Sequence, residues 1–432
     1  MHDFHYVGPK LFCERVAIES LVKKFGTPLY VYSQHTLEDH FQKLDRELTP
    51  LDHLICFAMK ANSNAAVMRT LANLGSGFDV VSEGELRRVI AAGGDPRQCV
   101  FAGVGKTERE IEFALRQGIY SFNVESEPEL VRISRVAARL KKVAPIAVRV
   151  NPNVDAHTHA KITTGTYENK FGIALEQVEG VYARASKLKN LRLRGLQMHI
   201  GSQLTDVQPF ELAVRKVVPL VAKLSAKYGF DFFSIGGGLG IIYKWALESG
   251  GASWWQSTRA RHILTPKTYA STLVPLLQPL GLRILIEPGR FIVGNAGILV
   301  TRVEYVKRTG HKNFVIVDAA MNDLIRPAFY DSYHEIVPTT QRNGGLISSD
   351  IVGPICESGD YFAKDRLLPK VSEGDHLALL SAGAYGFVMA SNYNSRATAA
   401  EVLVSGNKAA LVRERQKLAD IWKLEKVPQW LK

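Results

Sequence analysis

Short apolar runs alternate with amphipathic helical stretches through the first two-thirds of the chain. Each run ends in small or polar residues, and apolar residues at helical spacing then follow. The runs predicted to be strands are Leu54–Ala58, Gly77–Val81, Cys99–Ala102, Tyr120–Val124, Pro145–Val150, Leu193–Ile200, Phe230–Ile235 and Leu282–Ile286. The stretches predicted to be helices include Ala65–Leu74, Glu83–Ala92, Glu108–Gln117, Glu127–Lys142, Glu176–Lys187 and Pro209–Tyr228. Continuous apolar strands separated by helices are typical of a parallel sheet covered on both faces.

Eight such strand–helix units predict a (β/α)8 TIM barrel, and a doubly wound open sheet is the alternative that strand number leaves open. After Gly289 the pattern changes to strands separated by turns: Ile298–Lys307, Phe314–Asp318, Glu335–Pro338, His376–Leu380 and Glu401–Ser405. This pattern predicts a mostly antiparallel β domain. Pro28–Ser33 is predicted to be a further strand, which we expect to join that domain. The fold class is therefore α/β, with a barrel over residues 36–287 and a β domain over residues 1–35 and 288–432.

Composition and charge argue against several classes of function. The 54 Lys and Arg residues exceed the 42 Asp and Glu residues by 12, but they are scattered along helical stretches, so nucleic acid is not an expected partner. Four scattered cysteines fit a reducing compartment better than a disulfide framework or a zinc site. No stretch reaches the roughly 20 apolar residues of a membrane helix, and Met1–Lys10 lacks the core of a signal peptide. We expect a cytoplasmic protein without a membrane partner.

Polar side chains gather where the predicted barrel strands end, which is the rim that carries the active site in such barrels. Lys60 follows the first strand, Asp79 lies at the end of the second and His199 ends the sixth. The seventh strand runs into the glycine loop Gly236–Gly240, and the eighth into Glu287–Arg290. Taken singly, each feature has a structural explanation, such as a snorkelling lysine or a tight turn. Together on one rim they indicate an active site.

This set of residues supplies what pyridoxal 5'-phosphate (PLP) requires. A desolvated lysine such as Lys60 binds the cofactor's aldehyde covalently. A glycine-rich loop lets backbone N–H groups approach a phosphate closely. A carboxylate such as Glu287 keeps the pyridine nitrogen protonated, and an imidazole such as His199 lies against the ring. The rim therefore predicts a PLP enzyme.

Six motifs in matching order, over about residues 25–405, resemble diaminopimelate decarboxylase, a family of PLP enzymes with an alanine-racemase-type barrel. They are Phe57-Ala58-Met59-Lys60-Ala61-Asn62, His199-Ile200-Gly201-Ser202-Gln203, Gly236-Gly237-Gly238-Leu239-Gly240, Glu287-Pro288-Gly289-Arg290, Cys356-Glu357-Ser358-Gly359-Asp360 and Gly383-Ala384-Tyr385-Gly386. The resemblance implies decarboxylation of meso-2,6-diaminopimelate to L-lysine and CO2, the last step of lysine biosynthesis. It also implies a homodimer.

The resemblance further implies a role for each matching residue. Lys60, His199 and Cys356 would be the catalytic residues, with Lys60 carrying PLP and Cys356 donating a proton from the partner subunit, so that the dimer shares its active sites. Glu287 would lie on the pyridine nitrogen. The rest of the cofactor site would be Asp79, Ser202, Gly238, Pro288, Gly289, Arg290 and Tyr385. The substrate would be bound by Arg290, Arg326, Tyr330, Glu357 and Tyr385. His157 and His159, in a family-like loop, have the character of metal ligands, but no third ligand is evident and we expect no metal.

Three alternatives use the same scaffold. An ornithine or arginine decarboxylase differs in the acidic residue after the cysteine, where this chain has Glu357. A decarboxylase for D-lysine or D-ornithine is left open by the motifs. A non-catalytic PLP carrier lacks a C-terminal β domain, so residues 291–432 argue against it. The related alanine racemases have an arginine at the pyridine nitrogen, and Glu287 argues against that activity too.

Two segments depart from the family pattern or lie outside it. Lys244–Ile263, with Trp254 and Trp255, does not match what we expect after the glycine loop. A substrate lid and a surface excursion both account for this segment, and we favour the excursion. The tail Lys417–Lys432 is predicted to form a short amphipathic helix with Trp422 and Trp430, packed at an interface or edge.

Overall fold

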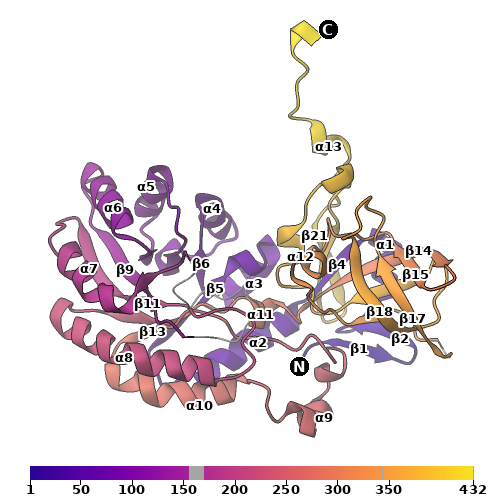
Figure 1. The fold of residues 1–432 in the computed structure, drawn as a ribbon, viewed down its shortest axis with the longest axis horizontal. Coiled ribbons are helices and arrows are strands. Elements are labelled where there is room, and N and C mark those ends of the chain that lie inside the picture. The colour runs from indigo at the N-terminus through magenta and orange to yellow at the C-terminus, as the bar shows by residue number, and fades with distance from the viewer. Residues whose placement is uncertain (155–169, 343, 432) are drawn as a thin grey trace. The chain divides into compact units, whose positions relative to one another are not determined.

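The computed structural model describes residues 1–154, 170–342 and 344–431, which divide into two compact units (Figure 1). Unit 1 comprises Met1–Thr36, Ile242–Ser257 and Val293–Lys432, and unit 2 comprises Leu37–Ile241 and Thr258–Ile292. The chain thus enters each unit more than once. Residues 242–257 belong to unit 1, although they fall inside the range that the sequence assigned to the barrel.

Unit 2 is a closed parallel barrel, as predicted. Within its described residues, eight strands pair side by side, and the last returns to the first with Leu285 opposite Leu54. In ring order they are β5 (His53–Ala58), β6 (Gly77–Val80), β7 (Cys99–Phe101), β8 (Ser121–Val124), β9 (Ala144–Asn151), β11 (Leu191–Met198), β12 (Phe232–Ser234) and β13 (Arg283–Ile286). A short strand, β10 (Ile173–Ala174), adds to β9. Because the ring closes, the open-sheet alternative is excluded.

Helices follow the barrel strands, and polar residues at the strand ends start them. Asn64, Ser82, Thr107 and Ser126 each accept a hydrogen bond from a backbone N–H in the first turn of the next helix. Such caps satisfy donors that a helix start otherwise leaves unpaired. The helices are α2 (Gln34–Glu47), α3 (Ala65–Asn73), α4 (Glu83–Ala91), α5 (Glu108–Gln117), α6 (Glu127–Arg139), α7 (Val178–Ala185), α8 (Gln208–Tyr228) and α10 (Pro266–Leu277) (Figure 1).

Apolar side chains from separate strands fill the barrel. Cys56, Val100, Ala147, Phe232 and Leu285 come from five of the strands and form one fully buried cluster. This packing follows the layered interior expected of a TIM barrel. A filled interior leaves the rim at the strand ends as the place where polar side chains can converge.

Unit 1 is built on a mostly antiparallel sheet, again as predicted. Its path runs β18-β17-β15-β14-β4-β20-β21, and β19 pairs with both β14 and β16. The strands are β4 (Leu29–Ser33), β14 (Gly297–Arg308), β15 (Asn313–Val317), β16 (Ile336–Pro338), β17 (Leu346–Val352), β18 (Tyr361–Pro369), β19 (His376–Leu379), β20 (Ala400–Ser405) and β21 (Lys408–Arg413). β4 lies between β14 and β20, so the expectation that the N-terminal segment joins the β domain is confirmed.

The segment 242–257 is part of the core of unit 1. Ala246 is fully buried in the same apolar cluster as Leu29 and Val300. The backbone N–H of Leu247 donates to the Glu335 carboxylate at 2.9 Å, and Trp254 is also buried. The expectation of a surface excursion is therefore wrong for these residues, because tertiary contacts that the local sequence does not reveal anchor them.

The N-terminal hairpin and the C-terminal tail also differ from the sequence pattern. β1 (Phe4–Val7), β2 (Lys10–Cys13) and β3 (Val16–Ala17) form a small antiparallel sheet, followed by α1 (Ile18–Phe25), and we did not predict either. The tail is helical only in short pieces, such as α13 (Ala419–Trp422). Trp422 and Trp430 are 51% and 84% exposed, so neither residue is buried within the chain.

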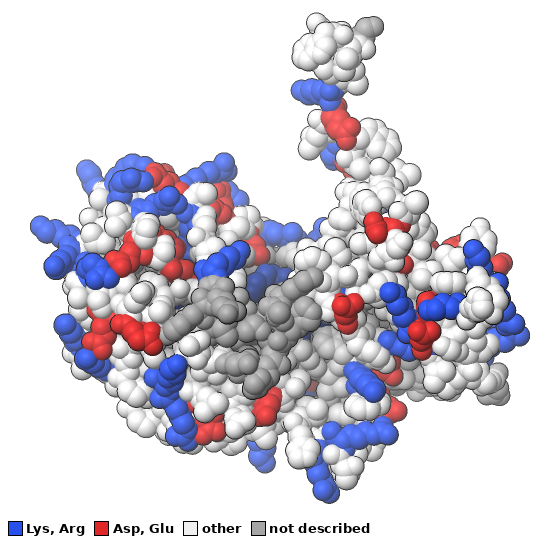
Figure 2. All heavy atoms as spheres, viewed as in Figure 1, with Lys and Arg blue, Asp and Glu red and all other residues white. Residues whose placement is uncertain are grey.

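Charges of both signs share the surface. Figure 2 shows Lys and Arg side chains interspersed with Asp and Glu over the face in view. Arg139, at the end of α6, pairs with Glu108 and Glu112 of α5 at 3.2 and 3.0 Å. Arg139 thus belongs to an ion-paired helix surface.

Candidate active site at the barrel rim

The barrel strands bring the predicted rim residues to one end of unit 2. Lys60 lies in a 3-10 turn, Met59–Ala61, directly after β5, and Asp79 lies in β6. His199 follows β11, and Glu287 follows β13. Because the strands are parallel, their carboxyl ends share one rim. The sequence pattern placed these residues on the correct strands.

Lys60 and Asp79 form an ion pair with a Nζ–Oδ2 distance of 2.9 Å. The Asp79 side chain is 1% exposed, whereas that of Lys60 is 42% exposed, so the amine is held by a buried carboxylate yet is open to the rim. The second Asp79 oxygen, Oδ1, is buried with no hydrogen-bond partner among the described residues. A buried acceptor without a donor is unusual and points to a ligand at this place.

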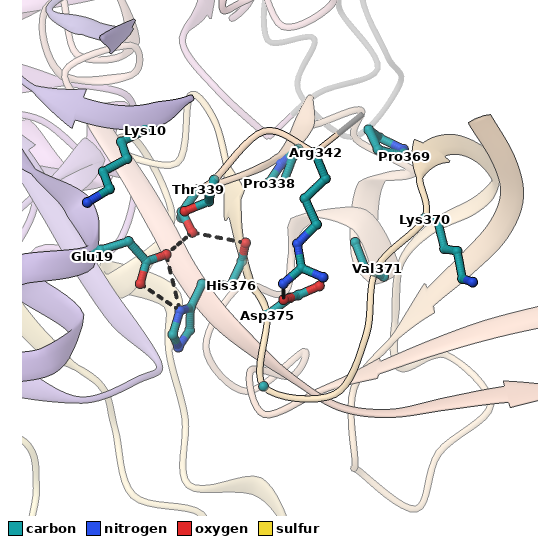
Figure 3. A pocket seen from close by; sticks show the side chains of 12 residues that line it. Lys10, Glu19, Pro338, Thr339, Arg342, Pro369, Lys370, Val371, Asp375 and His376 are labelled. Carbon is teal, nitrogen blue, oxygen red and sulfur yellow. Dashed lines mark hydrogen bonds and ion pairs between the residues drawn. The ribbon is translucent and has the colours of Figure 1, made fainter. Parts of the chain in front are cut away.

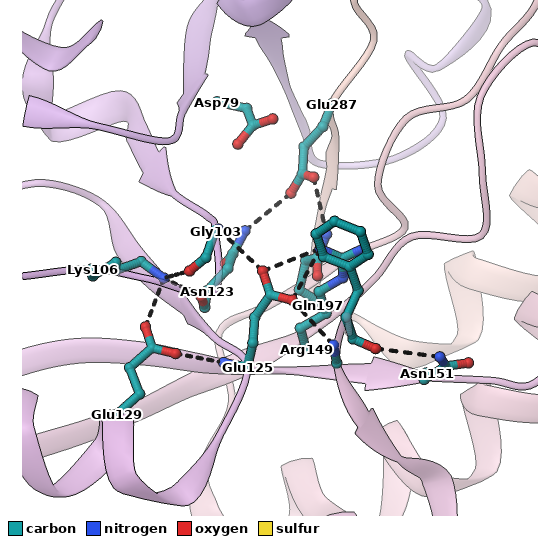
Figure 4. A network of polar contacts seen from close by, with 12 residues as sticks. Asp79, Gly103, Lys106, Asn123, Glu125, Glu129, Arg149, Asn151, Gln197 and Glu287 are labelled. Carbon is teal, nitrogen blue, oxygen red and sulfur yellow. Dashed lines mark hydrogen bonds and ion pairs between the residues drawn. The ribbon is translucent and has the colours of Figure 1, made fainter. Parts of the chain in front are cut away.

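Glu287 is held by uncharged donors from three other strands, and Figure 4 shows two of them, Asn123 and Gln197. Ser234 Oγ donates to Oε1 at 2.7 Å, Gln197 Nε2 donates to Oε2 at 3.0 Å, and Asn123 Nδ2 reaches Oε1 at 3.3 Å. Burial raises the pKa of Glu287 to about 7, with a further increase from Asp79, while the hydrogen bond from Ser234 opposes it. The carboxyl group therefore gains or loses its proton near neutral pH.

Sequence reasoning missed the three donors to Glu287. Asn123 lies in β8, Gln197 in β11 and Ser234 in β12, and all three are almost fully buried. The signal available was a polar residue inside an otherwise apolar strand. Such a residue needs a buried partner, but the sequence does not identify that partner.

Two buried ion pairs lie next to this group (Figure 4). Arg149 pairs with Glu125 at 3.2 Å, and Glu125 also accepts the backbone N–H groups of Gly103 and Gly172. Lys106 pairs with Glu129 at 2.7 Å and donates to the backbone carbonyl of Asn123 at 2.8 Å. These pairs tie the loops after β7, β8 and β9 together. Because buried charges are costly to unpair, they keep this side of the rim fixed.

His199 is held in one neutral form. The backbone N–H of Gly237 donates to Nδ1 at 3.2 Å, so the neutral ring carries its proton on Nε2. Burial lowers the pKa of His199 well below its ordinary value, and Arg149 and Lys60 lower it further. The ring is therefore uncharged at neutral pH.

The glycine loop after β12 is too closely packed for side chains. A Cβ on Gly237 would lie 2.1 Å from the carbonyl oxygen of Glu287, and one on Gly238 would lie 2.7 Å from that of Gly201. Gly238 also has φ = 118°, which favours glycine. Nearby, Arg290 Nη2 donates to Ser202 Oγ at 3.1 Å, and Pro288 and Gly289 connect Glu287 to this arginine. Because its glycines have no side chains, the loop can bring its backbone close to the rim.

The remaining predicted residues lie in unit 1. Arg326 and Tyr330 bound the short helix α12 (Arg326–Tyr330). Cys356 and Glu357 are exposed, on the loop between β17 and β18. Of the four cysteines, all of which the structure describes, Cys356 alone is exposed, and all four are free thiols.

Asp360 holds the cysteine loop in place. Its carboxylate is buried and accepts the backbone N–H groups of Ile355 and Met321, both at 2.7 Å. Asn394 Oδ1 accepts the N–H of Cys356 at 3.1 Å. With its base fixed in this way, the loop presents Cys356 and Glu357 outward.

Tyr385 lies on a tight turn. Its φ of 57° is in the left-handed region, which non-glycine residues adopt at an energetic cost. A Cβ on the following Gly386 would lie 2.4 Å from the carbonyl oxygen of Ala382. Strain of this kind concentrates at functional sites.

A separate cavity of about 420 Å³ lies in unit 1, lined by Lys10 of β2, Glu19 of α1, the end of β16 and the start of β19 (Figure 3). Several of its polar or charged lining side chains form hydrogen bonds or ion pairs with other lining residues. Glu19 accepts from Thr339 and His376, and Arg342 pairs with Asp375. Among the described residues, no buried polar side-chain atom of this cavity lacks a hydrogen-bond partner, whereas Asp79 Oδ1 at the barrel rim does.

Neither a metal site nor a membrane span is found in the described part of the chain. No three side chains among His, Cys, Asp and Glu come together there as metal ligands. His157 and His159 lie outside the described residues. The described helices are each too short or too polar to cross a membrane.

Comparisons with known proteins all find pyridoxal-dependent decarboxylases. Residues 34–294 match the family described as pyridoxal-dependent decarboxylase, pyridoxal binding domain. The chain is 49% identical to diaminopimelate decarboxylase of Vibrio cholerae, over 97% of each chain. It is 48% identical to that of Pseudomonas aeruginosa, over 98% of each.

Solved structures give the same result. Diaminopimelate decarboxylase of M. jannaschii in complex with L-lysine is similar with a TM-score of 0.91, at 35% identity over the full length of both chains. The enzyme of Helicobacter pylori, also complexed with L-lysine, has a TM-score of 0.87 at 40% identity, covering 94% of this chain and 99% of the other.

Proposed function

This chain belongs to the diaminopimelate decarboxylases, within the pyridoxal-dependent decarboxylases, and on that premise we propose which of its residues do the work. The protein is a carboxy-lyase that uses PLP and converts meso-2,6-diaminopimelate to L-lysine and CO2. This conclusion rests on the sequence identity of 48–49% to enzymes of that name over nearly the full length of the chains. L-lysine in two similar structures agrees with the expected product.

The barrel rim fits PLP on three counts. Lys60 offers an amine beside the buried Asp79, whose second carboxylate oxygen has no hydrogen-bond donor among the described residues. Glu287 offers a buried carboxyl group whose hydrogen-bond donors are all neutral. The loop Gly236–Gly240 offers backbone without side chains at its four glycines. An aldehyde, a pyridine nitrogen and a phosphate are the groups that these three features suit.

When bound, PLP supplies an electron sink for the electron pair that decarboxylation leaves on Cα. Lys60 would hold the cofactor covalently. Glu287, as the carboxylate, would hold a proton on the pyridine nitrogen, and that positive charge would in turn favour the ionised form of Glu287. His199 is neutral and would lie against the ring without repelling it. Asp79, Ser202, Gly238, Pro288, Gly289, Arg290 and Tyr385 would complete the cofactor site.

The substrate has a second amino-acid head, remote from the reacting carbon. Arg290 and Arg326 would bind its carboxylate, since a guanidinium suits a carboxylate in a two-pronged pair. Glu357 would pair with its ammonium group, and Tyr330 and Tyr385 would add contacts. A substrate without that head would leave these groups unpaired.

Cys356 would donate the proton that Cα receives after CO2 leaves. We propose that it acts from the partner subunit of a homodimer. The support is its exposure on a loop whose base is fixed by Asp360, which suits a group that a second copy covers. We also propose the cytoplasm as the compartment, because all four cysteines are free thiols.

The experiment for the cofactor assignment is chemical mapping of the lysine. Borohydride reduction of the purified yellow enzyme should abolish its visible absorbance and leave a pyridoxyl group on the Lys60 peptide. Lys60→Ala should release CO2 from meso-diaminopimelate at no more than about a thousandth of the normal rate. A pyridoxyl group on another lysine would remove Lys60 from its role.

A further inference from the structure

Arg326 is a buried cation surrounded by neutral groups. Its side chain belongs to a residue that is 5% exposed. Nη1 donates to Tyr243 Oη at 2.7 Å and contacts His334 Nε2 at 3.3 Å, while Nη2 donates to Ser332 Oγ at 3.2 Å. Arg326 makes no ion pair with any described residue. A buried charge without a counter-charge is costly, so this position calls for an anion from outside the chain.

His334 takes part as an acceptor. It is fully buried, and its Nδ1 lies 2.9 Å from the carbonyl oxygen of Leu380. A carbonyl only accepts, so Nδ1 carries the proton and the lone pair of Nε2 faces Arg326. His334 is therefore neutral in this arrangement and leaves the positive charge of Arg326 intact.

Tyr243 contacts both Arg326 and His334. Its ring centroid lies 5.0 Å from the guanidinium carbon of Arg326. The same ring meets His334 edge-on, with centroids 5.2 Å apart and planes at 81°. Tyr243 thus adds a cation–π contact to its hydrogen bond, which restricts the guanidinium in both position and orientation.

The backbone beside Tyr243 is fixed by unit 1. Asn295 and Ser381 both donate to the carbonyl oxygen of Ile242, at 3.4 Å. On the other side, Ala246 is in the apolar core and Leu247 is bonded to Glu335. Because Glu335 adjoins His334, one short stretch of unit 1 anchors the segment and also supports the arginine.

We infer that Tyr243, with His334 and Ser332, positions Arg326 to receive a carboxylate, and that Tyr243 is a specificity-determining residue. This inference rests on the proposed function, in which Arg326 binds the distal carboxylate of the substrate. A guanidinium has five N–H donors, and the described residues occupy three. Two remain for the ligand. A carboxylate partner from the protein would have cancelled the charge, whereas three neutral partners preserve it. Through Tyr243, the segment 242–257 thereby contributes to substrate choice.

The test compares Tyr243→Phe with Tyr305→Phe, a matched control on β14 whose side chain is 62% exposed. Tyr243→Phe keeps the ring and removes the hydroxyl. It should raise KM for meso-diaminopimelate about tenfold, the effect of one hydrogen bond to a charged group, with kcat within about twofold. Turnover of D-lysine, which lacks the distal carboxylate, and the visible absorbance of bound PLP should not change. Tyr305→Phe should behave as the unmodified enzyme.

A second arm separates this inference from the proposed function. Arg326→Lys should itself raise KM for meso-diaminopimelate, and adding Tyr243→Phe should then raise KM by clearly less than tenfold, because both act through one guanidinium. If Arg326→Lys leaves KM unchanged, the proposed role of Arg326 fails. If Arg326→Lys raises KM but Tyr243→Phe does not, or if Tyr243→Phe slows both substrates equally, only the positioning role is overturned.

Discussion

The pKa of Glu287 is set by burial and by a few neighbouring groups. Burial and the nearby Asp79 favour its protonated form, while Ser234 and Gln197 favour the carboxylate, and the resulting pKa is about 7. An ordinary glutamate titrates near 4.5. At a pH between these two pKa values, Glu287 is ionised in the unfolded chain but still protonated in the folded chain. The folded state therefore binds more protons, so the free energy of unfolding falls as the pH rises through this window.

This reasoning gives a prediction for the cofactor-free protein. Between pH 5 and pH 8 the unmodified chain should lose stability relative to Glu287→Gln, which has no proton to lose. The loss is at most on the order of 3 kcal/mol, and it should level off above about pH 7. Urea unfolding of both proteins at several pH values measures it. Parallel pH profiles for the two proteins would contradict the raised pKa.

The neighbours of Glu287 also show where sequence reasoning stops. Lys60, His199 and Glu287 could be placed because they follow apolar strands, and because strand ends of a parallel barrel share one rim. Asn123, Gln197 and Ser234 lie within the strands. Their importance depends on a contact with Glu287, which is between 53 and 164 positions away along the chain. A pattern with a period of a few residues carries no information about such a contact.

Strands and helices were predictable where burial is periodic. β5 and α5 match the predicted ranges to within one residue, because their apolar positions and capping residues are both clear. β17 and β18 are long, but several of their side chains are exposed, so no apolar run marks them. The segment 242–257 lies largely within the stretch that we expected to be a surface excursion. It is anchored by contacts with Glu335, directly before β16, and with His2, which are distant in the sequence and so are not part of the local pattern.

The tail illustrates the converse error at the scale of an element. Residues 417–432 have apolar residues at intervals that suggest one amphipathic helix. Among the described residues 417–431, only Ala419–Trp422 is α-helical, and Leu424 and Trp430 are more than 80% exposed. A short helix without tertiary packing is marginal in water, so the spacing alone was not sufficient.

For the whole molecule, the two units carry different parts of the proposed chemistry. Unit 2 carries the residues proposed for the cofactor except Tyr385, which belongs to unit 1 together with Cys356 and Arg326. The proposed homodimer supplies Cys356 from one subunit to Lys60 of the other. Such an arrangement makes each active site dependent on two chains.

Subunit mixing tests this arrangement. Lys60→Ala and Cys356→Ala should each be inactive alone. After exchange in equal amounts, half of the dimers should be mixed, and each should hold one intact site. Activity should then recover to about a quarter of that of the unmodified enzyme. Lack of recovery in dimers proven to have exchanged would mean that Cys356 acts within its own chain or not at all.

The central claim is that this decarboxylase is built for a substrate with a second carboxylate. Removing that carboxylate would leave Arg326 buried without a counter-charge, and sites of this kind reject analogues by roughly four powers of ten or more. The most direct measurement compares kcat/KM for meso-diaminopimelate, D-lysine and D-ornithine on the same enzyme. We predict that meso-diaminopimelate is favoured by at least about 10⁴-fold over either other amino acid. Equal or faster turnover of D-lysine or D-ornithine would contradict the claim.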